Sequence, residues 1–172
     1  ESDPHELEFR DQIVASCIDR LREIAAHPAV VDAVVAANPH SPRSQDEILT
    51  LDKQWRQASE ATDPVISPYL DNACAQFLKE VQKQHPAYAE LFVMDNQGCI
   101  VAESNKTSDY WQGDEPKWTE GFNGGQGKEF VDDIQYDQST LAFVVQISLP
   151  VNGPGGTTIG VLTVSVLSQK QP

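Results

Sequence analysis

The residues best suited to chemistry are concentrated in one ten-residue segment, 109–118. It holds three acids and three aromatic residues, and five of its side chains are candidate ligand-binding residues: Asp109, Tyr110, Trp111, Asp114 and Trp118. Aromatic faces beside carboxylates can hold a cation, because the face of an aromatic ring is electrostatically negative. The alternative is that the two tryptophans fold back over the chain as a hydrophobic roof with no ligand beneath it.

A second candidate group lies in segment 132–140, where Tyr136, Asp137 and Ser139 follow two acids. Asp and Ser are also ordinary turn formers, because their side chains hydrogen-bond nearby backbone amides. Together with the acids of the first segment, these residues favour a small ligand that is neutral or positively charged. Two alternatives stay open: Lys117 binds a carboxylate, or the acids form a solvated rim.

Catalysis and metal binding have little support in the sequence. The four histidines lie in the N-terminal half, and none accompanies a nucleophile motif. The acids lack the spacing of a calcium loop. The glycine-rich segment 121–127 follows a predicted helix and precedes a predicted strand, which is the reverse of a phosphate-binding loop. We predict that it forms a helix end and a turn. We therefore expect no enzymatic activity, no cofactor and no metal.

The chain of 172 residues carries a formal net charge of -14. Nucleic acid and anionic membrane surfaces would repel such a chain, so we expect neither as a partner. A well-solvated surface would explain the charge equally well. Every apolar run is too short to cross a bilayer. Three cysteines, Cys17, Cys74 and Cys99, are spaced too widely for a zinc site, and we expect buried thiols, with one disulfide as the alternative.

The C-terminal half is predicted to form a sheet. Two short apolar runs, 91–94 and 99–102, flank the turn sequence Asp95-Asn96-Gln97-Gly98, which predicts a β-hairpin. Three more extended runs follow at 128–134, 140–149 and 157–167. Five strands with one long insertion predict an antiparallel sheet.

The N-terminal half is predicted to be helical. Asp3 caps a long amphipathic helix, a second helix follows at 28–37 after a bend near Pro28, a capping box at Ser44 opens a third, and Ser67 opens a fourth. Helices that precede strands predict an α+β fold, with the helices packed on an antiparallel sheet. The first helix either covers its own domain or forms a dimer seam.

The order of these segments is itself informative. An apolar run, Asp-x-x-Gly and a second apolar run at 92–104 are followed by the loop residues 108–115, then by Ile147-Ser148-Leu149-Pro150-Val151 and Ile159-Gly160-Val161-Leu162. This order resembles the Cache (PAS-like, PDC-type) family of extracytoplasmic sensor domains. Members have a PAS-like sheet and belong to bacterial histidine kinases, chemoreceptors and cyclic-dinucleotide enzymes.

The resemblance implies roles for individual residues. In Cache sensors the corresponding loop and helix cover the ligand cavity, and many amine-binding and amino-acid-binding members place an acid after a tyrosine, as in Tyr136-Asp137, to hold the ligand's ammonium. The amino-acid binders also have Arg-x-Trp-Tyr at the start of the lid helix, where the arginine holds a carboxylate. This chain has Pro116-Lys117-Trp118-Thr119 there and keeps only the tryptophan. We therefore predict no α-amino-acid ligand.

The resemblance also implies an organisation for the whole chain. Residues 1–172 would form a single sensor domain, with a helical part at 1–85, a PAS-like sheet at 89–167 and a lid loop at 104–127. It would be the periplasmic or extracellular portion of an inner-membrane histidine kinase, chemoreceptor or diguanylate cyclase, attached to the membrane through segments outside this sequence. Ligand binding would close the lid and displace the first helix and the last strand. The alternative is a ligand-free structural module that forms a homodimer through the first helix.

Overall fold

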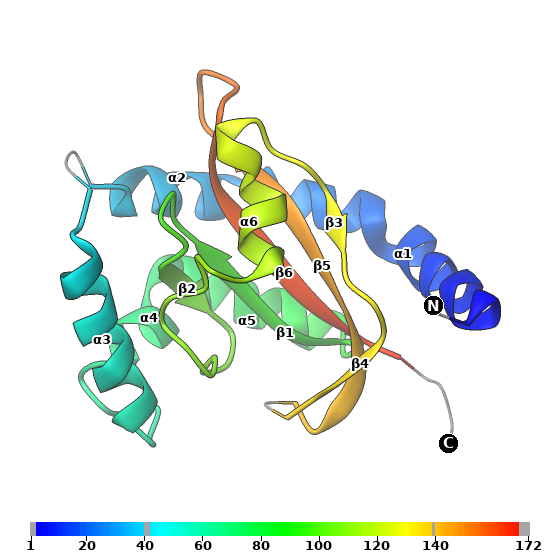
Figure 1. The fold of residues 1–172 in the computed structure, drawn as a ribbon, viewed down its shortest axis with the longest axis horizontal. Coiled ribbons are helices and arrows are strands. Elements are labelled where there is room, and N and C mark those ends of the chain that lie inside the picture. Colours follow the sequence, from blue (N-terminus) through cyan, green and yellow to red (C-terminus); the bar gives the residue numbers. More distant parts are fainter. Residues whose placement is uncertain (1–2, 40–41, 139, 169–172) are drawn as a thin grey trace.

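The computed structural model describes residues 3–39, 42–138 and 140–168. In these residues an antiparallel sheet of six strands lies between two groups of helices (Figure 1). The helices are α1 (Pro4–Ala25), α2 (Pro28–Ala37), α3 (Gln45–Gln57), α4 (Ser67–Asp71), α5 (Ala73–Gln84) and α6 (Pro116–Phe122), with a 3-10 turn η1 at Asn123–Gly125. The strands are β1 (Tyr88–Met94), β2 (Ile100–Glu103), β3 (Phe130–Val131), β4 (Gln135–Asp137), β5 (Ala142–Asn152) and β6 (Thr158–Leu167). The predicted α+β, PAS-like fold class is confirmed.

The sheet is built around the two long strands β5 and β6. The strand order is β2-β1-β6-β5-β3, and β4 also pairs with β5. The predicted hairpin is confirmed as β1 and β2, which pair antiparallel. The Asp95 carboxylate holds its turn, because it accepts hydrogen bonds from the backbone N–H groups of Gln97 and Cys99 at 2.8 and 3.0 Å. This is the local bonding expected of an aspartate at the start of a turn.

The prediction of one strand over 128–134 was wrong. Only Phe130–Val131 is strand there, and the chain pairs with β5 again at β4. Asp132 lies at the break, where its carboxylate accepts hydrogen bonds from the Asp133 N–H and the Gln135 side-chain amide, both at 2.9 Å. Such local bonds compete with a strand ladder. The sheet therefore has six strands instead of the predicted five.

The prediction of one continuous helix from Ser67 was also wrong. The chain leaves the helical conformation at Asn72, which separates α4 from α5. The Asn72 side chain accepts a hydrogen bond from the Ala75 N–H at 2.8 Å and donates one to the Val101 carbonyl at 2.9 Å. Asn72 is thus an N-cap that also ties the start of α5 to β2.

The other helix starts follow their predicted caps. Asp3 accepts from the His5 N–H at 2.9 Å, and Ser44 and Glu47 form both bonds of a capping box at α3. The bend near Pro28 is confirmed, because α1 ends at Ala25 and α2 begins at Pro28. The capping signals in the sequence therefore place three of the helix starts.

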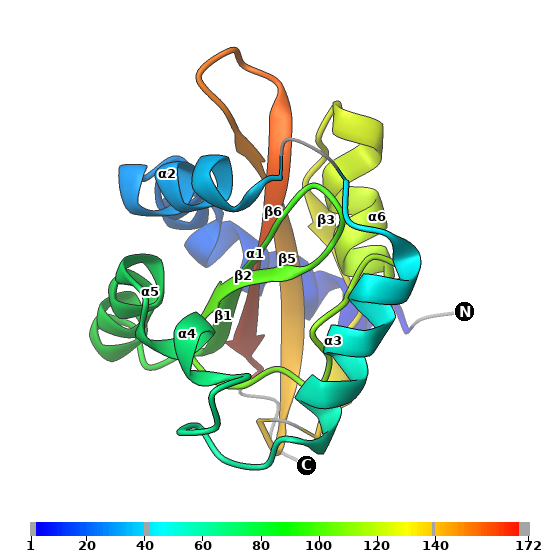
Figure 2. The same ribbon diagram turned by 90° about the vertical axis from the view of Figure 1, so that its left-hand side faces the viewer.

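The main hydrophobic core lies on one face of the sheet. Figure 2 shows α1, α2 and α5 on this side and α3 and α6 on the other. Alternate residues of the long strands point into the core and are buried: Val145, Ile147, Leu149 and Val151 of β5, and Leu162, Val164 and Val166 of β6. We call this side the apolar face and the α6 side the polar face.

The three cysteines are buried and free. Burial raises the pKa of the Cys74 and Cys99 thiols to about 12, so both stay protonated at neutral pH. The expectation of buried thiols is confirmed, and the disulfide alternative is wrong.

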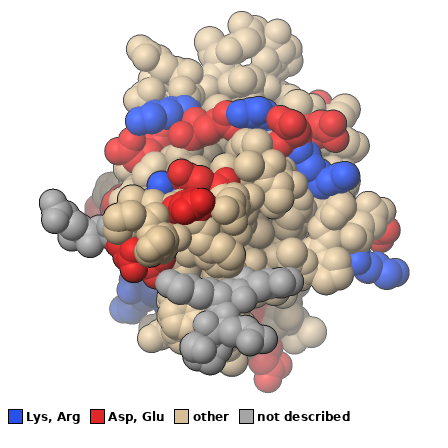
Figure 3. Space-filling view, turned by 90° about the vertical axis from the view of Figure 1, so that its right-hand side faces the viewer, with Lys and Arg blue, Asp and Glu red and all other residues tan. Residues whose placement is uncertain are grey.

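Ion pairs tie α1 to the chain around β3. Arg10 Nη1 lies 2.8 Å from Asp133 Oδ1, and Arg22 Nη2 lies 2.8 Å from Glu129 Oε1. On the face shown in Figure 3, basic side chains likewise lie beside acidic ones. Pairs this exposed contribute little to stability. Within the described ranges, no helix is both long enough and apolar enough to cross a membrane.

Candidate functional site

A row of buried polar side chains lies on the polar face of the sheet, beside the apolar side chains of Phe92, Met94 and Val161. The polar side chains come from alternate positions of three neighbouring strands: Glu90 of β1, Thr163 and Ser165 of β6, and Gln146 and Ser148 of β5, each at most 8% exposed. The hydroxyl oxygens of Ser148 and Thr163 lie 2.8 Å apart, and the Gln146 amide donates to Ser165 Oγ at 3.2 Å. Burying polar groups is costly unless they are hydrogen-bonded. These bonds therefore reduce the free-energy cost of burying the row.

Helix α6 packs directly on this face. A Cβ at Gly121 would lie 2.9 Å from Val161 Cγ1 and 3.4 Å from Ser148 Cβ, so the missing side chain lets α6 approach β5 and β6. The helix ends at Asn123, which has a positive φ of 47°. This is the left-handed cap typical of a helix C-terminus. The prediction that 121–127 forms a helix end and a turn is confirmed.

Two tryptophans fasten the lid segment (residues 104–127) to the β1–β2 turn. The indole N–H of Trp111 donates to the Gln97 carbonyl, and that of Trp118 donates to the Asp95 carbonyl, both at 2.9 Å. Both rings are partly buried against a second hydrophobic cluster between α3, the lid segment and the sheet. This geometry matches the hydrophobic roof more closely than a cavity wall.

One cavity opens between the start of α6, the 132–138 segment and β5. Its volume is about 320 Å³. The lining residues are Glu115, Pro116, Lys117, Asp132, Gln135, Tyr136, Asp137, Gln138, Val144 and Gln146. We call it the lid cavity. It therefore brings together the predicted Tyr136 and Asp137 with the lid helix and with Gln146, the end of the buried polar row.

The charges around the lid cavity are mostly negative. Among the described residues that line it, Lys117 is the one cation, and Glu115, Asp132 and Asp137 are the acids. Lys117 is already engaged, since its Nζ lies 3.1 Å from Glu115 Oε2 and 5.7 Å from the centre of the Phe92 ring.

The other predicted site residues lie elsewhere. Asp109 Oδ1 is 3.9 Å from Arg56 Nε, and Asp114 is exposed outside the cavity lining. Tyr110 is 2% exposed, and its ring packs against Trp55 and Tyr69 with 5.7 Å between the centroids of each pair. Ser139 lies outside the described residues. The five predicted site residues of segment 109–118 therefore lie outside the lining of the lid cavity, although Glu115, Pro116 and Lys117 of the same segment belong to it.

Sequence reasoning missed the polar residues inside the sheet. Gln146 stands between Val145 and Ile147, and Glu90 lies directly before Leu91. A polar residue at alternate positions of an otherwise apolar strand was the available signal, because such positions share one face.

Glu103 is the most unusual of the missed residues. Its side chain is 0% exposed, Oε2 accepts a hydrogen bond from the Thr107 N–H at 2.9 Å, and Oε1 has no hydrogen-bond partner. Burial raises the pKa of its carboxyl to about 8, opposed by the Thr107 bonds and raised further by the charge of Glu90. Glu103 is therefore protonated in much of the population at neutral pH.

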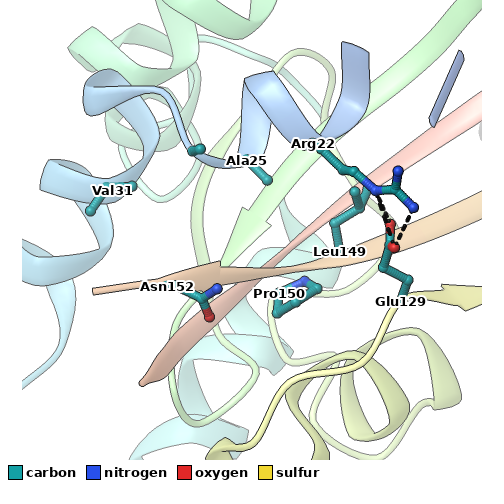
Figure 4. Close-up of a pocket in the computed structure, with 8 residues that line it drawn as sticks. Arg22, Ala25, Val31, Glu129, Leu149, Pro150 and Asn152 are labelled. Atoms are coloured by element: carbon teal, nitrogen blue, oxygen red, sulfur yellow. Dashed lines mark hydrogen bonds and ion pairs between the residues drawn. The ribbon is translucent and has the colours of Figure 1, made fainter. Parts of the chain in front are cut away.

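A second cavity lies on the apolar side of the sheet (Figure 4). It has a volume of about 330 Å³ and is bounded by the end of α1, by α2 and by β5. The Arg22 guanidinium spans both carboxylate oxygens of Glu129 across its mouth, at 2.8 to 3.2 Å. Arg22 and Glu129 pair with each other, so their charges are already neutralised and contribute little to binding a ligand.

The fold is shared with a solved sensor domain. Neither the protein-family models nor the curated proteins include a match. Among solved structures, the E. coli DcuS sensor domain matches with a TM-score of 0.54 and 14% identity, covering 93% of this chain and 92% of that one. The V. cholerae histidine kinase DctB sensor domain has a TM-score of 0.46 and 15% identity, covering 94% of this chain and 54% of that one. The ligand-binding domain of the Campylobacter jejuni chemoreceptor Tlp3, in complex with 4-methylisoleucine, has a TM-score of 0.45 and 17% identity, covering 100% and 68%.

The DcuS comparison carries the assignment of the fold, because it spans nearly the whole of both chains. This chain has the fold of the PDC/Cache-type extracytoplasmic sensor domains, and the resemblance stated from the sequence is confirmed at that level.

Proposed function

We propose that this chain is the small-molecule-binding sensor domain of a membrane-bound signalling receptor, with the lid cavity as its ligand site. The observation that carries the proposal is the buried polar row on one face of the sheet, which leads into a cavity under the lid helix. A fold that needed only a second core would place apolar residues there. The fold shared with the DcuS sensor domain supports the same function.

The charge of the cavity supports a neutral or cationic ligand. Asp137 and Asp132 line it together with the exposed ring of Tyr136, which packs edge-on against Phe143 with 5.4 Å between the ring centroids. A carboxylate next to an aromatic face is a favourable setting for an ammonium group. The volume of about 320 Å³ lies at the lower end of the usual range for ligand pockets, so we expect a small molecule.

Signalling would proceed by a population shift. Helix α6 contacts both β5 and β6, and α1 packs against the opposite side of β5. A ligand that binds more tightly when α6 is closed shifts the domain toward that state. Movement of β5 and β6 would then displace α1 and the end of β6. We infer that these two elements pass the signal to the rest of a receptor in the inner membrane.

A thermal-shift screen tests this proposal. The panel contains amines, amino acids, carboxylates, purines and divalent cations, and calorimetry follows each hit. We expect a neutral or cationic compound to raise the Tm, and Asp137→Asn to weaken its binding at least tenfold. Asp114→Asn, an exposed lid acid outside the cavity, is the matched control and should bind like wild type.

The opposite results would favour the rival function. A domain that no compound stabilises, and that light scattering shows to be a dimer disrupted by substitutions on α1, would be a dimerisation module. A hit that Asp137→Asn leaves unchanged would place the ligand away from the lid cavity.

A further inference from the structure

Two buried acceptor oxygens near the lid lack partners. Glu103 Oε1 and Gln112 Oε1 have no hydrogen bond, although their side chains are 0% and 1% exposed. Both residues belong to one bonded loop: Thr107 donates its N–H to Glu103 and its hydroxyl to the Asp109 carbonyl, which also accepts from the Gln112 amide. Unpaired buried acceptors are costly, and here two of them occur in one loop. When the Glu103 carboxyl is ionised, the described residues provide no hydrogen-bond donor to either oxygen.

Glu90 adds a second buried carboxyl to this group. Glu103 pairs with Phe92 across β1 and β2, and Glu90 lies two residues before Phe92, on the same face of β1. Glu90 is 3% exposed, and its charge raises the pKa of the Glu103 carboxyl. The other charged groups are Lys106, which lowers that pKa, and Lys117 of α6, whose Nζ lies over the Phe92 ring. The inner group is thus acidic and buried.

The inner group is continuous with the lid cavity. Gln146 lines the cavity and donates to Ser165 Oγ, and Ser165 pairs with Glu90 in the β1–β6 ladder. The buried polar row therefore runs from the cavity on β5, across β6, to the acids of β1 and β2. Because Glu103 is 0% exposed, a ligand reaches it only when the lid segment moves away.

We propose that Glu103, with Glu90 and Gln112, forms an inner subsite of the ligand site that binds a protonated primary amine. An ammonium group supplies three N–H donors and no acceptor, which is what two unpaired oxygens beside a second carboxyl require. This inference rests on the proposed function and names the chemical class of the ligand. The bond between Glu103 and the amine would also offset the free energy needed to open and reclose the lid segment.

The proposal includes a proton transfer. In the empty domain the Glu103 carboxyl holds its proton at neutral pH; when the ammonium binds, the carboxyl O–H bond breaks, the proton passes to the buffer, and the carboxylate accepts an ammonium N–H. Amine binding is therefore coupled to release of up to one proton, and its affinity rises with pH by up to about tenfold per pH unit below the pKa of the carboxyl.

Calorimetry on the wild-type domain tests this coupling. The probes are propylamine, putrescine and spermidine, with propionate and succinate as the matched anions, each titrated at pH 6 and pH 7 in phosphate and in bis-Tris, which carries no primary amine. We expect amines to bind, an enthalpy that differs between the two buffers because a proton is released, and an affinity up to about tenfold higher at pH 7.

Two variants assign the effect to Glu103. Glu103→Gln keeps the shape of the protonated acid but cannot ionise, so it should abolish proton release and weaken amine binding at least tenfold. Glu80→Gln, at an exposed acid of α5 on the other side of the sheet, should change neither. Asp137→Asn should weaken binding but keep the proton release.

Each contrary outcome has a separate meaning. Amines that bind without proton release, or equally well to Glu103→Gln, would overturn the inner subsite and leave the lid cavity as the ligand site. Binding of the anions alone would also overturn it, with the sensor function intact. If none of the probes binds, the inner subsite for primary amines is overturned, and the broader thermal-shift panel decides the sensor function separately.

Discussion

The two faces of the sheet are made by the same strands but differ in what they bury. On β5, Ile147 points into the core beneath α1 and α5, and its neighbour Ser148 points toward α6; both are 0% exposed. The apolar face gains stability from every side chain it removes from water. The polar face combines a smaller apolar cluster around Phe92, Met94 and Val161 with a row of buried polar groups. That row only exchanges hydrogen bonds with water for internal ones, at small net gain. The row of polar groups is therefore the part of the sheet that stability alone does not explain.

This difference assigns separate tasks to the two helix layers. The packing of α1, α2 and α5 on the apolar face fixes the sheet as a rigid body. The lid helix α6 packs on Ser148 and Val161, and the Trp118 indole ties it to the β1–β2 turn. Ligand-binding elements are generally drawn from the less stable parts of a fold. The lid can therefore open without disturbing the main core.

The largest expected effect concerns pH and the polar face. The Glu103 carboxyl has a pKa of about 8 in the fold, above the value of about 4.3 in an unfolded chain. A carboxyl whose pKa is raised stabilises the fold while protonated, so this stability is present below the unfolded pKa and is lost as the pH rises through about 8. Between pH 5 and pH 9 we expect the free energy of unfolding of wild type to fall by about 4 kcal/mol relative to that of Glu103→Gln.

Urea unfolding of both proteins across this pH range measures the difference. Glu80→Gln should run parallel to wild type, because that acid is exposed. If the stabilities of wild type and Glu103→Gln change in parallel with pH, Glu103 is ionised in the native state. The polar face would then bury a charged carboxylate instead of a neutral carboxyl group.

Features of the fold could be predicted from the sequence where they depend on residues close together in the chain. The caps at Asp3 and Ser44 and the Asp95 turn depend on residues close in the chain, and these were predicted. The alternation of polar and apolar residues on β5 is equally local, but it was missed. The break at Asn72 was not predicted, because the Asn72 side chain bonds to Val101, a residue 29 positions away. Propensity within one segment carries no information about such a partner.

The candidate site shows the same limit. Tyr136 and Asp137 could be placed at a cavity from a short motif, although their ligand contacts stay a prediction. The burial of Tyr110 depends on Trp55 and Tyr69, which lie on other elements. The unpaired oxygen of Glu103 depends on the path of the whole lid segment. Long-range packing of this kind has no signature in composition or spacing.

A core truncation on the apolar face should give the next largest effect. Ile147→Ala removes buried methyl and methylene groups from a side chain that is 0% exposed, and we expect a loss of about 3 kcal/mol in the free energy of unfolding. Urea unfolding measures this loss. Binding of any thermal-shift hit should persist in the folded fraction, because Ile147 points away from α6. A loss below about 1 kcal/mol would show that the apolar face does not dominate stability.

The smallest effect should come from the neighbouring position on the polar face. Ser148→Ala leaves the buried Thr163 hydroxyl without its partner 2.8 Å away, so we expect a loss of about 1 kcal/mol. Replacing both partners, in Ser148→Ala with Thr163→Val, should recover part of that loss, because no buried hydroxyl is then left unpaired. Urea unfolding of the two single variants and the double variant forms a complete cycle. Costs that simply add would contradict a mutual hydrogen bond and would make the hydroxyls independent contributors to the surface beneath α6.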